Sequence, residues 1–131
     1  MLAIGDTFLL PKKADSKEHL WIVITEERDG LAVGVNLTKV RDGCDMTVVV
    51  NPGDHPFVNC QSIVLYQDSR MLNLKSLEEL FKRQTQNFTC STHAKCSDIF
   101  LKRLQGGLID SPFTPNEILE FCAKEWGVQL P

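Results

Sequence analysis

The feature that most constrains the fold is a series of short apolar runs, rich in β-branched and aromatic residues, in the first 72 residues. Residues 20–25 read LWIVIT, and the turn signal EERDG separates this run from LAVGVNL at residues 31–37. Apolar runs of this length, bounded by charged or turn-forming residues, are typical of buried β-strands. Gly34 within the second run indicates a bulge or a close backbone approach. We predict further strands over residues 6–10, 46–50 and 62–66.

After Arg70 the spacing of the apolar residues changes from the period of strands to that of helices. Capping residues predict three helix starts, at Ser76, at Ser97 and at Thr114–Pro115. The second helix is expected to end at Gly106–Gly107, since glycine commonly follows the last helical turn.

Strands joined by short turns at roughly ten-residue spacing favour an antiparallel small β-barrel or a curled sheet. Strands first and helices last indicate an α+β fold. We therefore predict one domain over residues 1–131, with a β-barrel part at 1–72 and about three helices in a C-terminal part at 73–131.

Charge and hydropathy exclude several classes of protein. The formal net charge is -3, which argues against a general nucleic-acid coat but leaves room for a local basic cleft. No run reaches the ~18 apolar residues of a membrane span, so no membrane partner is expected. The start, MLAIGDTFLL, lacks the basic and long apolar regions of a signal peptide. We therefore expect a cytoplasmic protein in which the five cysteines are mostly reduced.

One spacing of soft ligands raises the question of a metal site. Cys90, His93 and Cys96 follow one another at three-residue intervals, as ligands of a Zn²⁺ ion can. A structural zinc site needs a fourth ligand, which could come only from a distant cysteine such as Cys60 or Cys122. We therefore favour a loop with two reduced thiols, and expect neither a metal nor a cofactor.

The turn NPGDHP at residues 51–56 carries more chemistry than a turn requires. His55 can give or take a proton near neutral pH, and Asp54 beside it could bias its charge. The following proline holds His55 in an extended conformation. The alternative is structural: Asn51 and Asp54 would satisfy amides of the turn, while His55 would stack on Phe57 or cap a strand end.

A second polar group stands at the end of the third predicted strand, in the sequence NLTKVR. Thr38 offers a hydroxyl, while Lys39 and Arg41 offer positive charge, and this combination suits a phosphate. Asp42 and Asp45 follow closely and could neutralise part of that charge. The alternative is an ordinary solvated hairpin end.

The order of these motifs resembles the MazF/PemK/Kid group of small-barrel toxins. GDTFLL is similar to the Gly-Asp-hydrophobic strand with which those proteins open, and HLWIVIT to a strand reading roughly Arg-Pro-x-x-Val-Val-Ser. VNLT is similar to a strand ending in Pro-(Ile/Val)-Thr-Ser, with Thr38 on the threonine. The likeness covers roughly residues 4–70, and the helical tail marks a divergent branch.

The resemblance implies an SH3-like barrel, usually a homodimer, that cleaves single-stranded RNA without a metal. The ribose 2′-hydroxyl would attack the adjacent phosphate, a reaction that needs a base, an acid and a cation on the developing charge. An antitoxin protein would be the partner that blocks the groove.

The chain departs from the family at the charged positions of the site. The Arg-x-Asp pair of the family falls on Asn59 and Gln61, and His19 is nearest to the arginine of its first loop. We expect three residues to replace them in catalysis: His55 to move the proton, Arg41 to hold the phosphate and Thr38 to orient it. The expected substrate-binding residues are His19, Lys39, Asp54, Asn59 and Gln61. If these replacements do not act, the same fold would serve as a non-catalytic module that binds a protein partner.

Overall fold

The computed structural model describes residues 1–11, 17–83 and 91–131 of the chain and confirms the α+β class. Within these residues lie seven strands, three α-helices and a short 3-10 turn at Tyr66–Asp68. The strands are β1 (Thr7–Pro11), β2 (Glu18–Val23), β3 (Leu31–Lys39), β4 (Val49–Val50), β5 (Ser62–Val64), β6 (Arg70–Asn73) and β7 (Ser91–His93). The helices are α1 (Leu74–Lys82), α2 (Asp98–Asp110) and α3 (Asn116–Trp126).

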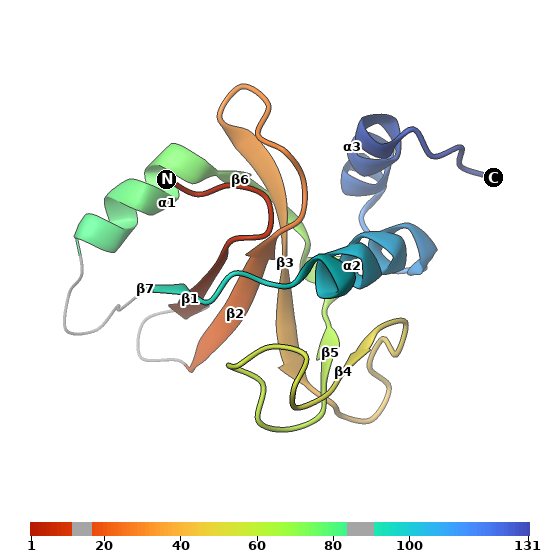
Figure 1. Ribbon diagram of the computed structural model, residues 1–131. Helices are drawn as coiled ribbons and strands as arrows, with labels where there is room; N and C mark the ends of the chain where they lie inside the picture. Colours follow the sequence, from red (N-terminus) through yellow and green to blue (C-terminus); the bar gives the residue numbers. More distant parts are fainter. Residues whose placement is uncertain (12–16, 84–90) are drawn as a thin grey trace.

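The strands form an antiparallel sheet organised around the long strand β3. One edge of β3 pairs with β2, while the other pairs first with β6 and then with β5. The path continues through β1 to β7 on one side and ends at β4 on the other (Figure 1). The two end strands do not pair with each other among the described residues, so the predicted closed barrel is not confirmed.

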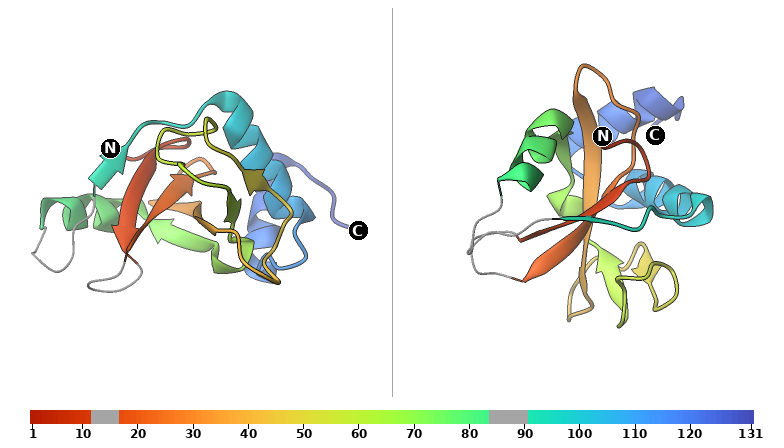
Figure 2. Two further views of the ribbon diagram at one scale, coloured as in Figure 1. Left: turned by 90° about the horizontal axis from the view of Figure 1, so that it is seen from below. Right: turned by 60° about the vertical axis from the view of Figure 1, so that its left-hand side comes forward.

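Both faces of the sheet are covered by helices. Leu20 and Ile22 of β2 point to one face and pack in a cluster with α2 and α3, as alternation along a strand requires. Trp21 between them points to the other face and joins a second cluster with α1. Figure 2 shows the sheet between α1 on one side and α2 with α3 on the other. The continuous apolar run of β2 therefore reflects burial on both faces.

Three strands differ from the sequence-based prediction, and one of them, β6 at Arg70–Asn73, was not predicted at all. Strand β4 is only two residues long and starts at Val49 instead of Met46; before it, the Thr47 amide donates a hydrogen bond to the Asp45 side chain. Strand β7 lies within the part predicted to be helical and pairs with β1. The division at residue 72 is therefore not a division between sheet and helices.

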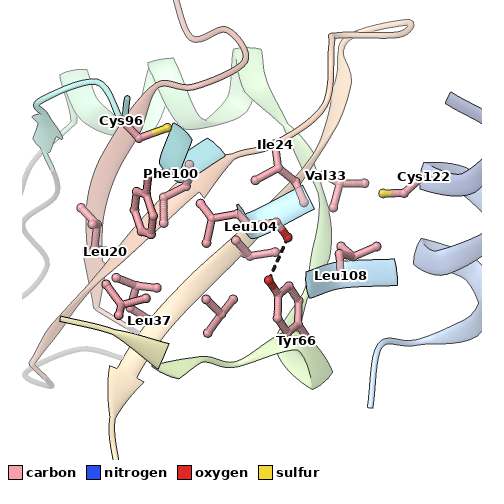
Figure 3. Packing of buried hydrophobic residues seen from close by; sticks show 14 of the residues in the cluster. Leu20, Ile24, Val33, Leu37, Tyr66, Cys96, Phe100, Leu104, Leu108 and Cys122 are labelled. Atoms are coloured by element: carbon pink, nitrogen blue, oxygen red, sulfur yellow. Dashed lines mark hydrogen bonds between the residues drawn. The ribbon is translucent and has the colours of Figure 1, made fainter. Parts of the chain in front are cut away.

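Helix α2 packs against the sheet through Tyr66, whose buried hydroxyl donates a 2.8 Å hydrogen bond to the carbonyl of Leu104 (Figure 3). Gly107 lies against the same ring, and a Cβ at this position would overlap the Tyr66 hydroxyl. The prediction that Gly106–Gly107 ends the helix is wrong, since α2 continues to Asp110. Gly107 lets α2 pack closely against Tyr66 and does not end the helix.

The predicted helix starts were only partly correct. Ser97 caps α2 and accepts a hydrogen bond from the Phe100 amide, as expected. Helix α1 starts earlier than predicted, because Asn73 caps it and accepts from the Ser76 amide. Helix α3 starts at Asn116, close to the predicted Thr114–Pro115, but Thr114 does not cap it; its hydroxyl donates to the Leu108 carbonyl of α2 instead. No helix of the described residues is long and apolar enough to cross a membrane.

Candidate functional site

A cleft of about 510 Å³ opens where the start of β2 and the end of β3 face the segment after β4. Five of the eight predicted site residues line it: His19, Thr38, Lys39, Arg41 and Asn59. These residues come from separate stretches of the chain and meet only through the fold. The volume lies within the range of small-ligand sites, about 300–1,000 Å³.

His19 lies near the start of β2, where it pairs with Leu10 of β1. The pairing of β2 with β3 begins two residues further on, at Trp21 with Asn36. The Nδ1 of His19 lies 3.0 Å from the carbonyl oxygen of Leu37, which can only accept, so Nδ1 carries the hydrogen. In the neutral ring, Nε2 is then the nitrogen with a lone pair. His19 is therefore a half-buried imidazole of defined tautomer that can accept a proton at the cleft.

Positive charge at the cleft comes from the end of β3. Arg41 donates a 3.2 Å hydrogen bond to the Thr38 hydroxyl, which holds the guanidinium over the strand end. The guanidinium has five N–H donors, so others remain for an anion, and the exposed Lys39 adds a second cation. The arrangement suits a phosphate.

Asp45 does not neutralise these cations as its position in the sequence suggested. Its carboxylate is buried and accepts hydrogen bonds from the hydroxyls of Ser111 and Thr47. Burial raises the pKa of Asp45, but these hydrogen bonds outweigh burial and lower it below its usual value. The Asp45 carboxylate therefore links the loop before β4 to the end of α2 through hydrogen bonds.

The opposite wall of the cleft is the segment from Phe57 to Cys60. Phe57 is 36% exposed, and its amide donates a 3.1 Å hydrogen bond to Nδ1 of His55. The amide of Val58 donates to the His55 carbonyl. His55 therefore supports this wall from behind.

His55 itself does not line the cleft. It is 2% exposed, and its Nε2 lies 2.6 Å from the carbonyl of Ala94 while Nδ1 accepts from Phe57. The ring is thus neutral with the hydrogen on Nε2, and both nitrogens are engaged. Burial lowers the pKa of His55, opposed by the Ala94 hydrogen bond and reinforced by His93. This geometry favours the structural alternative over a proton-transfer role.

The two remaining predicted residues also serve the turn. Asp54 accepts a 2.8 Å hydrogen bond from the Asn51 amide and forms a 3.2 Å ion pair with Arg103 of α2. The Asn51 hydrogen bond lowers the pKa of Asp54, burial opposes this, and Arg103 lowers it further. Gln61 donates to the Asn51 side chain at 3.2 Å. Asp54 and Gln61 therefore shape the turn behind the cleft.

Lys17 and Phe57 are among the cleft residues that the sequence did not single out. Lys17 lies at the cleft but belongs to a polar run that looks like any solvated loop. Phe57 could have been noticed as an aromatic residue directly after a turn, although nothing in the sequence indicates which way it faces. Both positions depend on how β2 and the turn meet in space.

The zinc hypothesis rests on a residue that the structure does not describe, because Cys90 lies outside the described residues. Among the described residues, no three histidine, cysteine or acidic side chains are grouped as a metal site. Cys96 is buried, and burial raises the pKa of its thiol, which disfavours the thiolate that a metal binds.

Comparison with known proteins does not assign a family. Neither the models of known protein families nor the curated proteins give a match to this chain. A function for the protein is therefore inferred from the residues of the cleft.

Proposed function

We propose that the protein is a divergent toxin-type endoribonuclease that cleaves single-stranded RNA without a metal, in the cleft between β2, β3 and the 57–60 segment. The observation that carries the proposal is the meeting of His19, Lys39 and Arg41 at one cleft. A histidine of defined tautomer beside two cations suits phosphodiester cleavage. The bent, open sheet is proposed as a variant of the SH3-like barrel that the resemblance implies.

The cleft supplies groups for the steps of this reaction. Nε2 of His19 would take the proton of the ribose 2′-hydroxyl as that oxygen attacks the adjacent phosphorus. Arg41, held by Thr38, would hold the phosphate and stabilise the charge that develops on it. The leaving 5′-oxygen needs a proton, for which Lys39 is the neighbouring cationic donor. His19 thus takes the role that the sequence suggested for His55.

The test is cleavage of a long, mixed-sequence single-stranded RNA in the presence of EDTA. His19→Ala should reduce the rate by roughly 10²–10⁴-fold, the usual contribution of a general base. Arg41→Ala should also reduce it strongly, because Arg41 stabilises charge that grows in the transition state. Arg83→Ala, which removes an exposed arginine after α1, should cleave as the wild type does.

His55→Ala separates the two histidines. Removing a buried ring with both nitrogens bonded should lower the melting temperature, whereas His19→Ala should leave it nearly unchanged. A folded His19→Ala protein with wild-type cleavage would overturn the assignment of the base. Failure of folded wild type to cleave any substrate in EDTA would overturn the proposed activity.

A second candidate is a non-catalytic module that binds a protein partner. It is favoured by the uncharged Asn59 and Gln61, which stand where the resembled family carries its charged pair. A copurifying partner together with no RNA cleavage would support it. In the toxin reading, an antitoxin would cover the cleft and stop cleavage, and the toxin would sediment as a homodimer.

A further inference from the structure

Phe57 is a partly exposed aromatic side chain on the cleft wall that the chemistry of cleavage does not use. Its ring is nevertheless held in place. The ring of His93 contacts it edge-on, with the centroids 5.8 Å apart and the planes at 80°. The amide of Phe57 is fixed by His55, whose own ring lies 5.1 Å from that of His93. An aromatic ring that contacts a neighbouring ring and stays 36% exposed at the cleft is suited to stacking.

The charges of the cleft indicate what would stack there. Arg41 and Lys39 stand at the end of β3, and both are exposed in the same cleft as Phe57. Proteins that bind single-stranded nucleic acids combine cations along the backbone with aromatic rings under the bases. An acidic peptide would need the cations but not the ring, whereas a nucleotide uses both.

We propose that Phe57 stacks an unpaired base of the RNA while Arg41 and Lys39 hold the neighbouring phosphate. This inference rests on the proposed function, and it adds that recognition requires a base free of a duplex. A paired base is already stacked on both faces and cannot reach Phe57. Selectivity for single strands would then come from one side chain of the cleft wall and not from the catalytic groups.

The test measures binding with cleavage blocked. Fluorescence anisotropy would follow a labelled 2′-O-methyl RNA, which lacks the attacking hydroxyl, and an abasic strand with the same number of phosphates. Wild type should bind the intact strand more tightly than the abasic strand. Phe57→Ala and Phe57→Leu should weaken binding of the intact strand by about 5- to 150-fold and leave binding of the abasic strand unchanged.

Two further variants control for the aromatic ring and for folding. Phe57→Tyr keeps the ring and should keep the preference for the intact strand. Phe113→Ala removes another exposed phenylalanine, 53% exposed and outside the cleft lining, and should bind as wild type does. Phe57→Leu keeps an apolar side chain at the wall, so its result stands even if Phe57→Ala does not fold.

Failure of this inference differs from failure of the proposed function. Equal binding of intact and abasic strands by wild type, or full binding of the intact strand by folded Phe57→Leu, would overturn base stacking and leave the cations as the binding groups. Absence of wild-type binding to both strands would overturn RNA recognition altogether. An equal loss of affinity for the intact and the abasic RNA in Phe57→Leu would overturn stacking and show that Phe57 acts only through the shape of the cleft.

Discussion

At the scale of single residues, the two histidines of the β-rich part have opposite environments. His19 is half-buried at the cleft with one nitrogen free for a proton in its neutral form. His55 is buried, and both nitrogens are used. A proton on Nδ1 of His55 would face the Phe57 amide, which is also a donor. Protonation of His55 should therefore oppose the folded state and disturb the wall that carries Phe57.

This leads to a prediction about pH. Burial lowers the pKa of His55 below its ordinary value of 6.5, so the unfolded chain binds the proton first as pH falls. The stability contributed by neutral His55 is fully present above about pH 6.5 and is lost toward the lower, folded-state pKa. The slope can reach at most about 1.4 kcal/mol per pH unit. Urea unfolding between pH 7.5 and 5 would measure it.

The control for this titration is His55→Asn, which removes the ionisable ring at the same position. The variant should be less stable at pH 7.5 but should lose less stability on acidification than wild type. The groups around His55 are His93 on β7, Asp54 beside it and Arg103 of α2, which pairs with Asp54. An unchanged slope in His55→Asn would show that the acid sensitivity comes from titrating groups other than His55.

At the scale of elements, helix α2 depends on the absence of a side chain at Gly107. A methyl group there would overlap the Tyr66 hydroxyl and Val48, so Gly107→Ala should force Tyr66 away from the Leu104 carbonyl. We expect a loss of about 1–3 kcal/mol, typical of overpacking. Gly106→Ala is the matched control, because a Cβ there meets no atom within 4 Å and should stabilise the helix by about 0.5–1 kcal/mol. Chemical denaturation of both variants tests the pair, and equal effects would contradict the packing argument.

The elements also show what sequence patterns can predict. Strands such as β2 and β3 are found because their apolar runs exceed what a loop would carry. Strand β7 reads STH and has no apolar run, so only its pairing with β1 defines it. The cations of residues 39–41 are found because they are adjacent in the chain. The sequence does not show whether His19 or His55 lies at the cleft, because this depends on which histidine the fold buries.

At the scale of the whole molecule, a hydrogen bond, an ion pair and a shared core connect the strand-rich part of the chain with the helical part. The buried Asp45 before β4 accepts from Ser111 after α2, and Arg103 of α2 pairs with Asp54 in the turn behind the cleft. Leu104 and Cys122 of the helices share a core cluster with strand residues. Neither part can bury its apolar face without the other, so the cleft should form only when the chain folds as one unit.

The two tryptophans allow us to measure whether the chain unfolds as one cooperative unit. Trp21 lies in the core between the sheet and α1, while Trp126 of α3 packs against the core on the opposite face. Trp126→Phe and Trp21→Phe each leave one tryptophan, which reports on one side of the sheet. In each variant we expect the fluorescence transition in urea to coincide with the far-ultraviolet circular dichroism transition, as two-state unfolding requires. A Trp126 transition at lower urea than the circular dichroism transition would mean that α3 leaves the core before the sheet unfolds, and the helical part would then be a separate cooperative unit.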